Sequence, residues 1–199
     1  MTYGGAQPSI NRVLASDFSR WPARIKEWAA GPLTEETLTC RELENFLDGS
    51  EKADLRWSNL APDGPSFPKI GVCSWKEWPW LLPYYGNSLI ELSRHCSDRM
   101  RIVLSAWVEA ERPIHLRFFP YDDHSQANEY RFLTRSRTIV RSVVRNQHDG
   151  VPAARAIFDA CVESLDDCII DIATRREDHG IRAWVVELNP VVGRDQDEW

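Results

Sequence analysis

The chain has 199 residues, enough for one domain or for two small lobes that share a cleft, and its hydrophobic (43%) and charged (27%) fractions are those of an ordinary globular protein. Its net charge of −6 disfavours a general affinity for nucleic acid or anionic membranes, and no apolar run approaches the roughly 20 residues that cross a bilayer. The five cysteines form no C-x-x-C pair, and the first residues lack the pattern of a signal peptide. We therefore expect a cytoplasmic protein with reduced thiols, whose partners are neither nucleic acid nor membrane.

The first half of the chain is predicted to be mainly helix and loop. Residues 1–16 are expected to form a flexible tail. A helix is expected over residues 34–49, with Thr34 as its N-cap and without a capping box. Residues 59–71 hold three prolines and two glycines and predict a loop, and residues 87–98 predict a short helix.

The second half changes to alternating, β-branched segments that are typical of strands. One helix, expected over residues 152–166, interrupts them and has an apolar stripe. The expected strands cover residues 101–109, 113–121, 128–134, 138–146, 167–174 and 182–189. Because short polar turns join several of these strands, we predict an α+β fold with a mainly antiparallel sheet.

The two closing strands carry the most informative polar residues. Alternate residues of a strand share a face, so Glu187 and Asn189 are expected to point together, away from the core. Asp171 lies inside an apolar strand, where a lone carboxylate is costly without a partner. These three oxygen-bearing side chains predict a Mg²⁺ site. The alternative is a solvated strand face, with Asp171 paired to an arginine. The opposite face of the last strand is expected to be core: Trp184, Val186 and Leu188.

Arginines on the preceding strands are candidates for phosphate binding, because a guanidinium donates in a fork. Arg131 shares a strand face with Glu129, while Tyr130 and Phe132 share the other face. A second basic series has even spacing but favours a charged, solvated edge strand: Arg137, Arg141 and Arg145. Arg56 precedes a Pro/Gly turn that could hold a phosphate, although most such turns are only loops.

The usual nucleotide-binding and hydrolase motifs are absent from the sequence. It contains no G-x-x-x-x-G-K-[ST], no G-x-G-x-x-G, no G-x-S-x-G and no H-E-x-x-H. The five histidines show no spacing typical of metal ligands. A nucleotide, if bound, would therefore be held neither by a P-loop nor by a Rossmann turn.

The order of the segments resembles the ATP-grasp proteins related to the eukaryotic cell-division-cycle chaperone that assembles translation initiation factor two, and their small bacterial and phage relatives. The resemblance covers about residues 17–192 and depends on order and spacing. The matching segments are Ser19-Arg20-Trp21 with the helix expected over residues 34–49, Arg56 to Asp63, Arg101 to Val108, Glu129-Tyr130-Arg131-Phe132, Asp171, and Glu187-Leu188-Asn189-Pro190. Family members often carry a lysine after the proline of the early loop, where this chain has Asp63 and its nearest lysine is Lys69.

The resemblance implies an ATP-grasp fold in which two small α+β lobes enclose ATP. Residues 17–100 would form the N-terminal lobe with a phosphate-binding loop, and residues 101–199 the C-terminal lobe with the metal site. Arg56 and Arg131 would contact the phosphates as catalytic residues, and Mg²⁺ would be held by Asp171, Glu187 and Asn189. Further nucleotide contacts would come from Ser58, Ala106, Trp107, Val108 and Glu129, with adenine near the backbone of residues 106–108.

Three functions are compatible with this resemblance. One is an ATP-dependent ligase or kinase-like enzyme that acts on a carboxylate, peptide or protein, with Mg²⁺ and arginines stabilising the transferred phosphoryl group. Another is a non-catalytic ATP-binding chaperone that assembles a protein partner. The last is a degenerate scaffold that binds no nucleotide.

Overall fold

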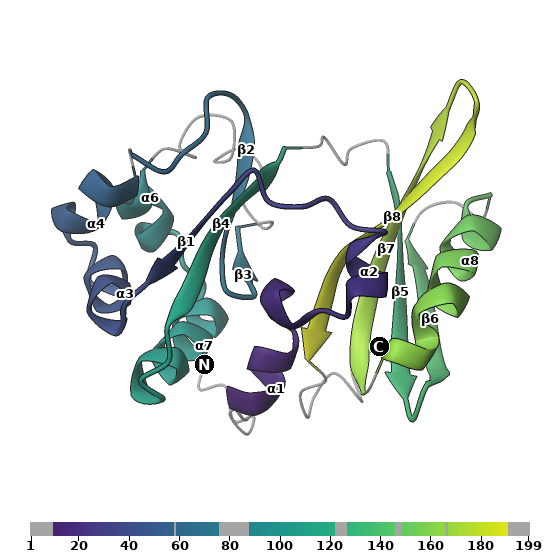
Figure 1. Cartoon of the computed structure of the whole chain (residues 1–199), viewed down its shortest axis with the longest axis horizontal. Helices are drawn as coiled ribbons and strands as arrows, with labels where there is room; N and C mark the ends of the chain where they lie inside the picture. Colours follow the sequence, from purple (N-terminus) through teal and green to yellow (C-terminus); the bar gives the residue numbers. More distant parts are fainter. Residues whose placement is uncertain are drawn as a thin grey trace. The chain divides into compact units, whose positions relative to one another are not determined.

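A computed structural model describes residues 10–57, 59–75, 88–121, 127–145, 149–165 and 167–190. Tertiary packing divides the chain into two compact units, one of residues 31–121 and one of residues 1–30 together with 122–199 (Figure 1). The boundary between the units differs from the lobe boundary expected after residue 100. The elements between residues 101 and 120 belong to the unit of residues 31–121. In the part of the chain that is described, no helix is long and apolar enough to cross a membrane.

The unit of residues 31–121 is built on a four-stranded antiparallel sheet with the order β1-β4-β2-β3. Its strands are β1 (Thr34–Leu38), β2 (Ser66–Ile70), β3 (Cys73–Ser74) and β4 (Ile114–Pro120). Its helices are α3 (Cys40–Leu47), α4 (Glu51–Trp57), α6 (Leu89–Arg94) and α7 (Asp98–Glu109). Buried aromatic residues fill its core, for example Trp57, whose ring centroid lies 4.4 Å from that of Phe118. The strand expected over residues 113–121 is confirmed as β4, and β2 lies within the expected loop of residues 59–71.

The helix expected over residues 34–49 is instead a strand followed by a shorter helix. Residues 34–38 alternate in exposure as strand β1, because they pair along their whole length with β4, and this tertiary pairing overrides the local preference. The N-cap of α3 is Thr39 and not Thr34. Its hydroxyl accepts from the Glu42 backbone N–H (3.3 Å), while Glu42 Oε2 accepts from the Thr39 backbone N–H (2.8 Å). A capping box is therefore present, contrary to the prediction.

The prediction of a strand over residues 101–109 is wrong, because this segment belongs to helix α7. Ser97 caps the helix, accepting from the Met100 backbone N–H at 3.3 Å. Val103, Leu104 and Trp107 are buried, a spacing of three and four residues that fits one helix face. A short apolar run such as Ile-Val-Leu is ambiguous between strand and helix until a partner surface selects one. The short helix expected over residues 87–98 is confirmed in part as α6.

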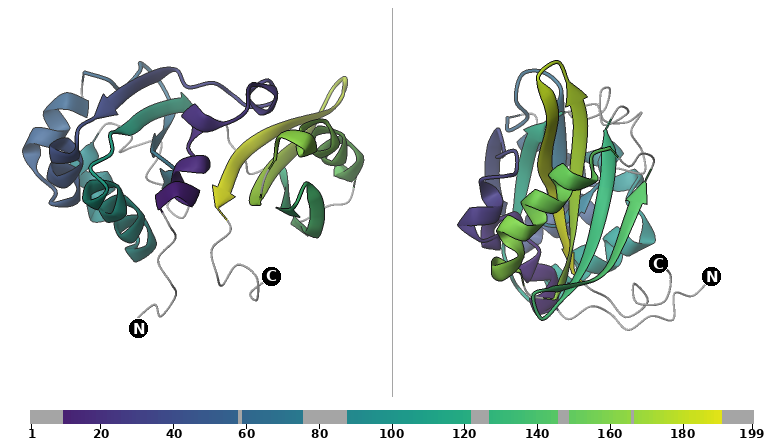
Figure 2. Two further views of the ribbon diagram at one scale, coloured as in Figure 1. Left: turned by 60° about the horizontal axis from the view of Figure 1, so that its bottom comes forward. Right: turned by 90° about the vertical axis from the view of Figure 1, so that its right-hand side faces the viewer.

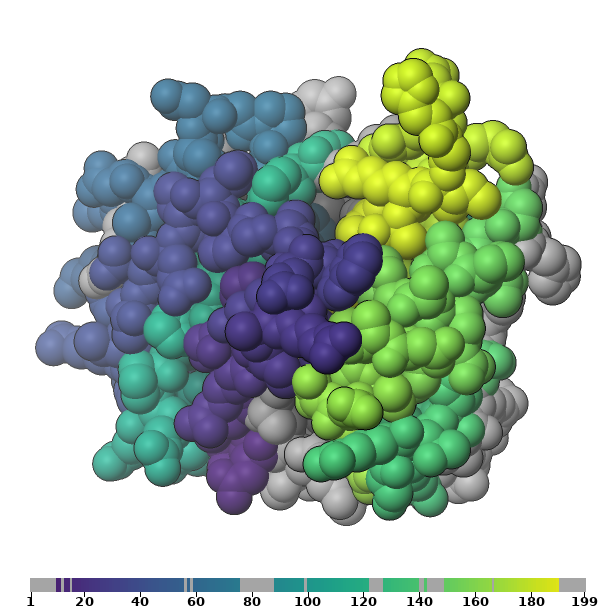
Figure 3. All heavy atoms as spheres, turned by 45° about the vertical axis from the view of Figure 1, so that its right-hand side comes forward, coloured from purple at the N-terminus to yellow at the C-terminus, as the bar shows by residue number. Residues whose placement is uncertain are grey.

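The second unit contains a four-stranded antiparallel sheet with the order β6-β5-β7-β8. Its strands are β5 (Asn128–Arg135), β6 (Thr138–Arg145), β7 (Cys168–Glu177) and β8 (Gly180–Pro190). Helix α8 (Val151–Cys161), continued by η3 (Val162–Ser164), covers one face of this sheet, and the β7–β8 hairpin extends beyond it (Figures 1, 2 and 3). The α+β fold with antiparallel sheets is thus as predicted, and so are these strands and this helix.

The N-terminal segment shares the core of this second unit. It comprises α1 (Ile10–Ala15), η1 (Phe18–Arg20) and α2 (Ala23–Lys26). Trp21 and Ile25 are buried in the cluster that α8 forms with its sheet. The Val185 backbone N–H donates to the Trp28 carbonyl at 2.8 Å, which ties the segment to β8. The same cluster includes Tyr130, Phe132, Ile157, Phe158, Ile170, Ile172 and Leu188.

Candidate functional site

A β-bulge on β8 decides which face each residue of the last strand occupies. Asp171 pairs with Glu187 and Ile172 pairs with Val185, so that Val186 is an extra residue between the two pairs. Val185 and Leu188 consequently both enter the core shared with α8. The expected core set is therefore right for Leu188 but wrong for Val186, whose place Val185 takes. Trp184 is buried as well, but outside that cluster and beneath two arginines of the opposite face.

Four side chains meet on the sheet face opposite α8, and we call them the polar row: Arg131, Asp171, Glu187 and Asn189. Strand register places Arg131 of β5 beside Asp171 of β7, and Asp171 beside Glu187 of β8. Arg131 donates to Asp171 through two nitrogens, Nε to Oδ1 at 2.6 Å and Nη2 to Oδ2 at 2.7 Å. Asp171 is fully buried and Glu187 is 8% exposed. Arg131 and Asn189 are half-buried, so the row is a partly buried polar network built around the buried Asp171.

The polar row concentrates negative charge around one arginine. Hydrogen bonding to Asp171 raises the pKa of Arg131, burial opposes that rise, and the nearby carboxylates of Asp171, Glu187 and Glu129 reinforce it. Arg131 therefore stays charged and fixes the orientation of Asp171. The pairing of Asp171 with an arginine, which the sequence left open as an alternative to metal binding, is present. Two of the three guanidinium nitrogens of Arg131, Nε and Nη2, donate to Asp171.

The chemistry of the polar row fits a hard cation. Asn189 Nδ2 donates to Asp171 Oδ2 at 3.2 Å and to Glu187 Oε1 at 2.9 Å, so two carboxylate oxygens converge on one positively polarised group. A rotation of this amide would present its oxygen in the same place, giving three oxygen ligands of the kind that Mg²⁺ prefers. Within the described residues, no group of three or more His, Cys, Asp or Glu side chains is arranged to hold a metal. The cation site would therefore depend on the amide of Asn189.

The remaining basic candidates of this sheet lie on or beside an edge strand. Arg137 is exposed in the β5–β6 turn with a φ of 62°. Arg141 and Arg145 belong to β6, opposite Leu133 and Glu129 in the register, and β6 is the outer strand of the sheet. The expected edge-strand position is therefore confirmed, with Arg141 and Arg145 on β6 and Arg137 in the turn beside it.

The two other nucleotide-binding segments expected from the resemblance both lie in the unit of residues 31–121. Arg56 lies in helix α4, one residue before its end, and Ser58 lies outside the described residues. Residues 106–108 are helical, so their carbonyls are already bonded: the Ala110 N–H donates to Ala106 at 3.1 Å and the Glu111 N–H to Val108 at 2.9 Å. A strand backbone open to adenine is therefore not formed at residues 106–108.

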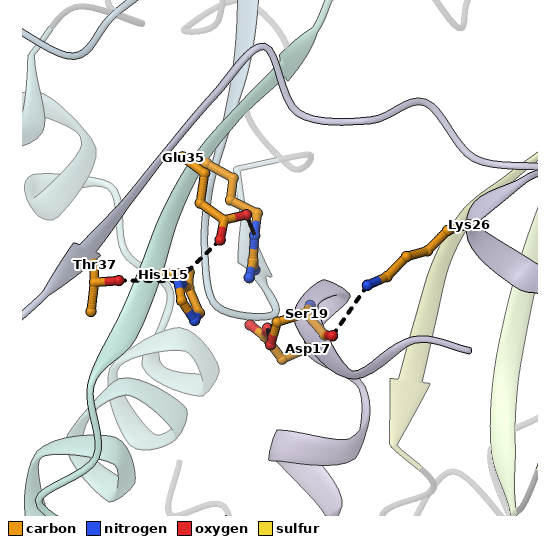
Figure 4. A network of polar contacts seen from close by, with 7 residues as sticks. Asp17, Ser19, Lys26, Glu35, Thr37 and His115 are labelled. Atoms are coloured by element: carbon orange, nitrogen blue, oxygen red, sulfur yellow. Dashed lines mark hydrogen bonds and ion pairs between the residues drawn. The ribbon is translucent and has the colours of Figure 1, made fainter. Parts of the chain in front are cut away.

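Sequence reasoning missed a second group of polar side chains, on the sheet of residues 31–121. Arg117 of β4 is fully buried, and its Nε donates to Glu35 Oε2 of β1 at 2.6 Å. His115 Nδ1 lies 3.3 Å from Glu35 Oε1 (Figure 4). On the adjacent strand β2, Lys69 Nζ lies 5.4 Å from the ring centroid of Phe119, and Arg117 faces Lys69 in the register. The alternation of residues 113–121, which was recognised as a strand, already places residues 115, 117 and 119 on one face.

Figure 4 also shows polar contacts within the N-terminal segment. Asp17 Oδ1 accepts from the Ser19 backbone N–H at 2.9 Å and from its hydroxyl at 2.6 Å, which caps η1. Lys26 Nζ donates to the Ser19 carbonyl at 3.1 Å. These contacts fix the turn that leads into Trp21, whose indole N–H donates to the Ser16 carbonyl at 2.8 Å. They position the N-terminal segment for packing in the core of its own unit.

Known structures resemble the chain as a whole. The structure of Cdc123 from Schizosaccharomyces pombe matches with a TM-score of 0.61 and 14% sequence identity, covering 90% of this chain and 85% of that chain. The chain is similar to Cdc123 in fold. C-terminally truncated Cdc123 from the same organism gives a TM-score of 0.61 at 15% identity, with coverages of 90% and 85%. The expected resemblance to the cell-division-cycle family is thus confirmed at the level of the α+β fold.

A further match is a RimK domain protein of the ATP-grasp type from Sphaerobacter thermophilus. Its TM-score is 0.42 at 17% identity, and the match covers 92% of this chain and 62% of that chain. No family model and no curated protein matches the sequence.

Proposed function

We propose that the chain binds ATP together with Mg²⁺ at the polar row. The observation that supports this proposal most is the convergence of the Asp171 and Glu187 carboxylates on one amide, beside an arginine, in a protein with the fold of Cdc123. A divalent cation held there would compensate two buried negative charges and would draw phosphate oxygens as its remaining ligands. When bound, Mg²⁺ supplies charge neutralisation of the phosphates.

The roles proposed for the residues follow from their contacts. Asp171, Glu187 and Asn189 would bind the cation, because all three bear hard oxygen donors. Arg131 would hold Asp171 in place and contact a phosphate, with Glu129 beside it. Arg56 and Ser58 are kept as nucleotide contacts only on the strength of the family resemblance, whereas residues 106–108 are not, because their backbone is helical.

Within residues 31–121, Lys69 is a stronger candidate for phosphate contact than Arg56. It lies on strand β2, next to the buried Arg117 of β4 in the strand register, and rigid strands position side chains more precisely than the end of a short helix. The loop after Arg56 has no lysine following its proline. We propose that Lys69 on this sheet face supplies the missing cationic group.

We propose that the bound ATP is used for ligation or phosphoryl transfer, with a carboxylate, peptide or protein as the acceptor. This chemistry requires positioning and charge stabilisation but no side-chain nucleophile. One observation favours the non-catalytic alternative, an ATP-dependent chaperone for a protein partner: Arg131 is already engaged by Asp171 through Nε and Nη2, which leaves less of its charge for a transferring phosphoryl group. A scaffold without nucleotide is the remaining alternative.

Isothermal titration of the full chain with ATP, with and without Mg²⁺, tests this proposal. We expect Mg²⁺-dependent binding that weakens roughly tenfold or more in Glu187→Gln and in Asn189→Ala, because each change removes one cation ligand. The matched control is Asp159→Asn, which removes an exposed carboxylate on α8. Absence of ATP binding by the folded wild-type chain, or equal binding by all variants, would contradict the proposal.

Release of ADP separates the enzymatic function from the chaperone function. Turnover that rises when a carboxylate, peptide or protein acceptor is added supports ligation or transfer. Binding without turnover under the same conditions supports the chaperone.

A further inference from the structure

The β7–β8 hairpin carries an ordered cationic cluster outside the polar row. Arg175 and Arg182 face each other in the register, and their guanidinium carbons lie 5.6 Å and 5.3 Å from the ring centroid of Trp184. Cation–π contact with one buried indole holds the two arginines side by side. Both reach the surface, since the Arg182 side chain is 54% exposed and that of Arg175 is 25% exposed.

A carboxylate of the same hairpin indicates what this cluster binds. Glu177 Oε1 lies 3.6 Å from Arg175 Nη2 and 3.7 Å from Arg182 Nη1, so one oxygen is shared between both guanidinium groups. These distances exceed the roughly 2.7–2.9 Å of a charge-assisted hydrogen bond. Glu177 is itself 44% exposed. The two arginines therefore attract a carboxylate, and Glu177 of the same hairpin fills this role only through long contacts.

We propose that Arg175, Arg182 and Trp184 form a docking site for an acidic segment of a protein partner, whose carboxylate displaces Glu177. The site goes beyond ATP binding and does not depend on it. Paired arginines over an aromatic ring are typical of residues that dominate protein interfaces. Their guanidinium forks match carboxylates in geometry as well as in charge.

The charges of the hairpin favour an acidic peptide over a nucleic acid. Residues 174–183 contain three arginines but also Glu177 and Asp178, in a chain with a net charge of −6. The third arginine, Arg176, donates to Asp149 at 2.9 Å instead of extending the cluster. A nucleic acid needs a continuous run of cations for its phosphates, whereas one carboxylate needs only the pair.

Fluorescence anisotropy of the full chain tests the proposal. The probe is a fluorescein-labelled peptide whose central residues are all glutamate, compared with a matched peptide that has glutamine in their place. We expect the glutamate peptide to bind and Arg182→Gln or Arg175→Gln to weaken it by about 3–10-fold, as for a charged pair at an interface. Glu177→Gln should strengthen binding by roughly 3-fold, because it removes the internal competitor.

Each variant has a control with the same change of charge. Arg176→Gln should change the affinity by less than about 2-fold, and Asp178→Asn should not reproduce the gain of Glu177→Gln. The proposal is overturned if the two peptides bind equally, if the paired variants and their controls behave alike, or if single-stranded polyuridylate binds the cluster and the glutamate peptide does not.

Discussion

Arg131 and Asp171 form the most constrained pair in the polar row. Asp171 has no exposed surface, and its carboxylate accepts two short hydrogen bonds from one guanidinium. Burying such a pair costs desolvation of both charges, and the attraction offsets that cost only when the geometry is good. Removing one partner is therefore far more harmful than removing both.

Arg131→Met is expected to lower the free energy of unfolding by about 3–5 kcal/mol, because it leaves a buried carboxylate without its main partner. The double variant Arg131→Met with Asp171→Leu should recover most of this loss. Urea denaturation of both variants measures the effect. Arg155→Met is the control, since it breaks an exposed pair with Asp159 and should cost about 0.5 kcal/mol or less. A double variant less stable than the single variant would contradict this view of the pair.

At the scale of elements, the bulge at Val186 makes the candidate site possible. Without the extra residue, Val185 and Glu187 would share a face of β8, and either an acid would enter the core or a core residue would leave it. With the bulge, Glu187 lies beside Asp171, while Val185 and Leu188 face α8 and pack in the core between α8 and the sheet.

Two valine substitutions distinguish the bulged strand from a regular one. Val185→Ala should cost about 2 kcal/mol of stability, because Val185 is 1% exposed in the core, whereas Val186→Ala should cost less than about 1 kcal/mol. A regular strand predicts the reverse order. Chemical denaturation of both variants measures the difference, and equal losses would contradict the register described for β8.

At the scale of the whole molecule, the chain begins in one packing unit, forms a second, and returns to the first. Residues 31–121 have their own sheet, while residues 10–30 complete the core of the sheet formed by β5 to β8. Trp21 is 6% exposed inside that core, although more than a hundred residues separate it from the strands it contacts. The N-terminal segment is thus part of the unit that carries the polar row.

Trp21→Ala is therefore expected to destabilise the protein by about 3–5 kcal/mol, through loss of buried aromatic surface and the cavity that remains. Trp28→Ala is a matched control, because Trp28 is 41% exposed and uses its backbone carbonyl to bond Val185. It should cost less than about 1 kcal/mol. Thermal and urea unfolding measure both, and a similar loss for the two tryptophans would show that the N-terminal segment is not part of the core.

Local patterns predicted the sheet of β5 to β8 well and the unit of residues 31–121 poorly. Strands β5 to β8 are each eight or more residues long, rich in β-branched and aromatic residues, and several are joined by short polar turns, so that few other structures suit them. Residues 34–38 are only five long, and residues 98–109 contain the short apolar run Ile-Val-Leu that suits a strand or a helix, so their local preference is weak. There the partner surface selected the structure, giving a strand where a helix was expected and a helix where a strand was expected.

The sequence by itself determined the α+β class, the antiparallel closing sheet and the strands that carry Asp171, Glu187 and Asn189, because strand-forming segments bounded by polar turns are a local property. Only the tertiary structure decided that Arg131 is the partner of Asp171, that a bulge exchanges Val186 for Val185 in the core, and that Lys69 and Arg117 share another polar face. Register, bulges and pairing depend on contacts between residues far apart in the chain, and local pattern does not encode them.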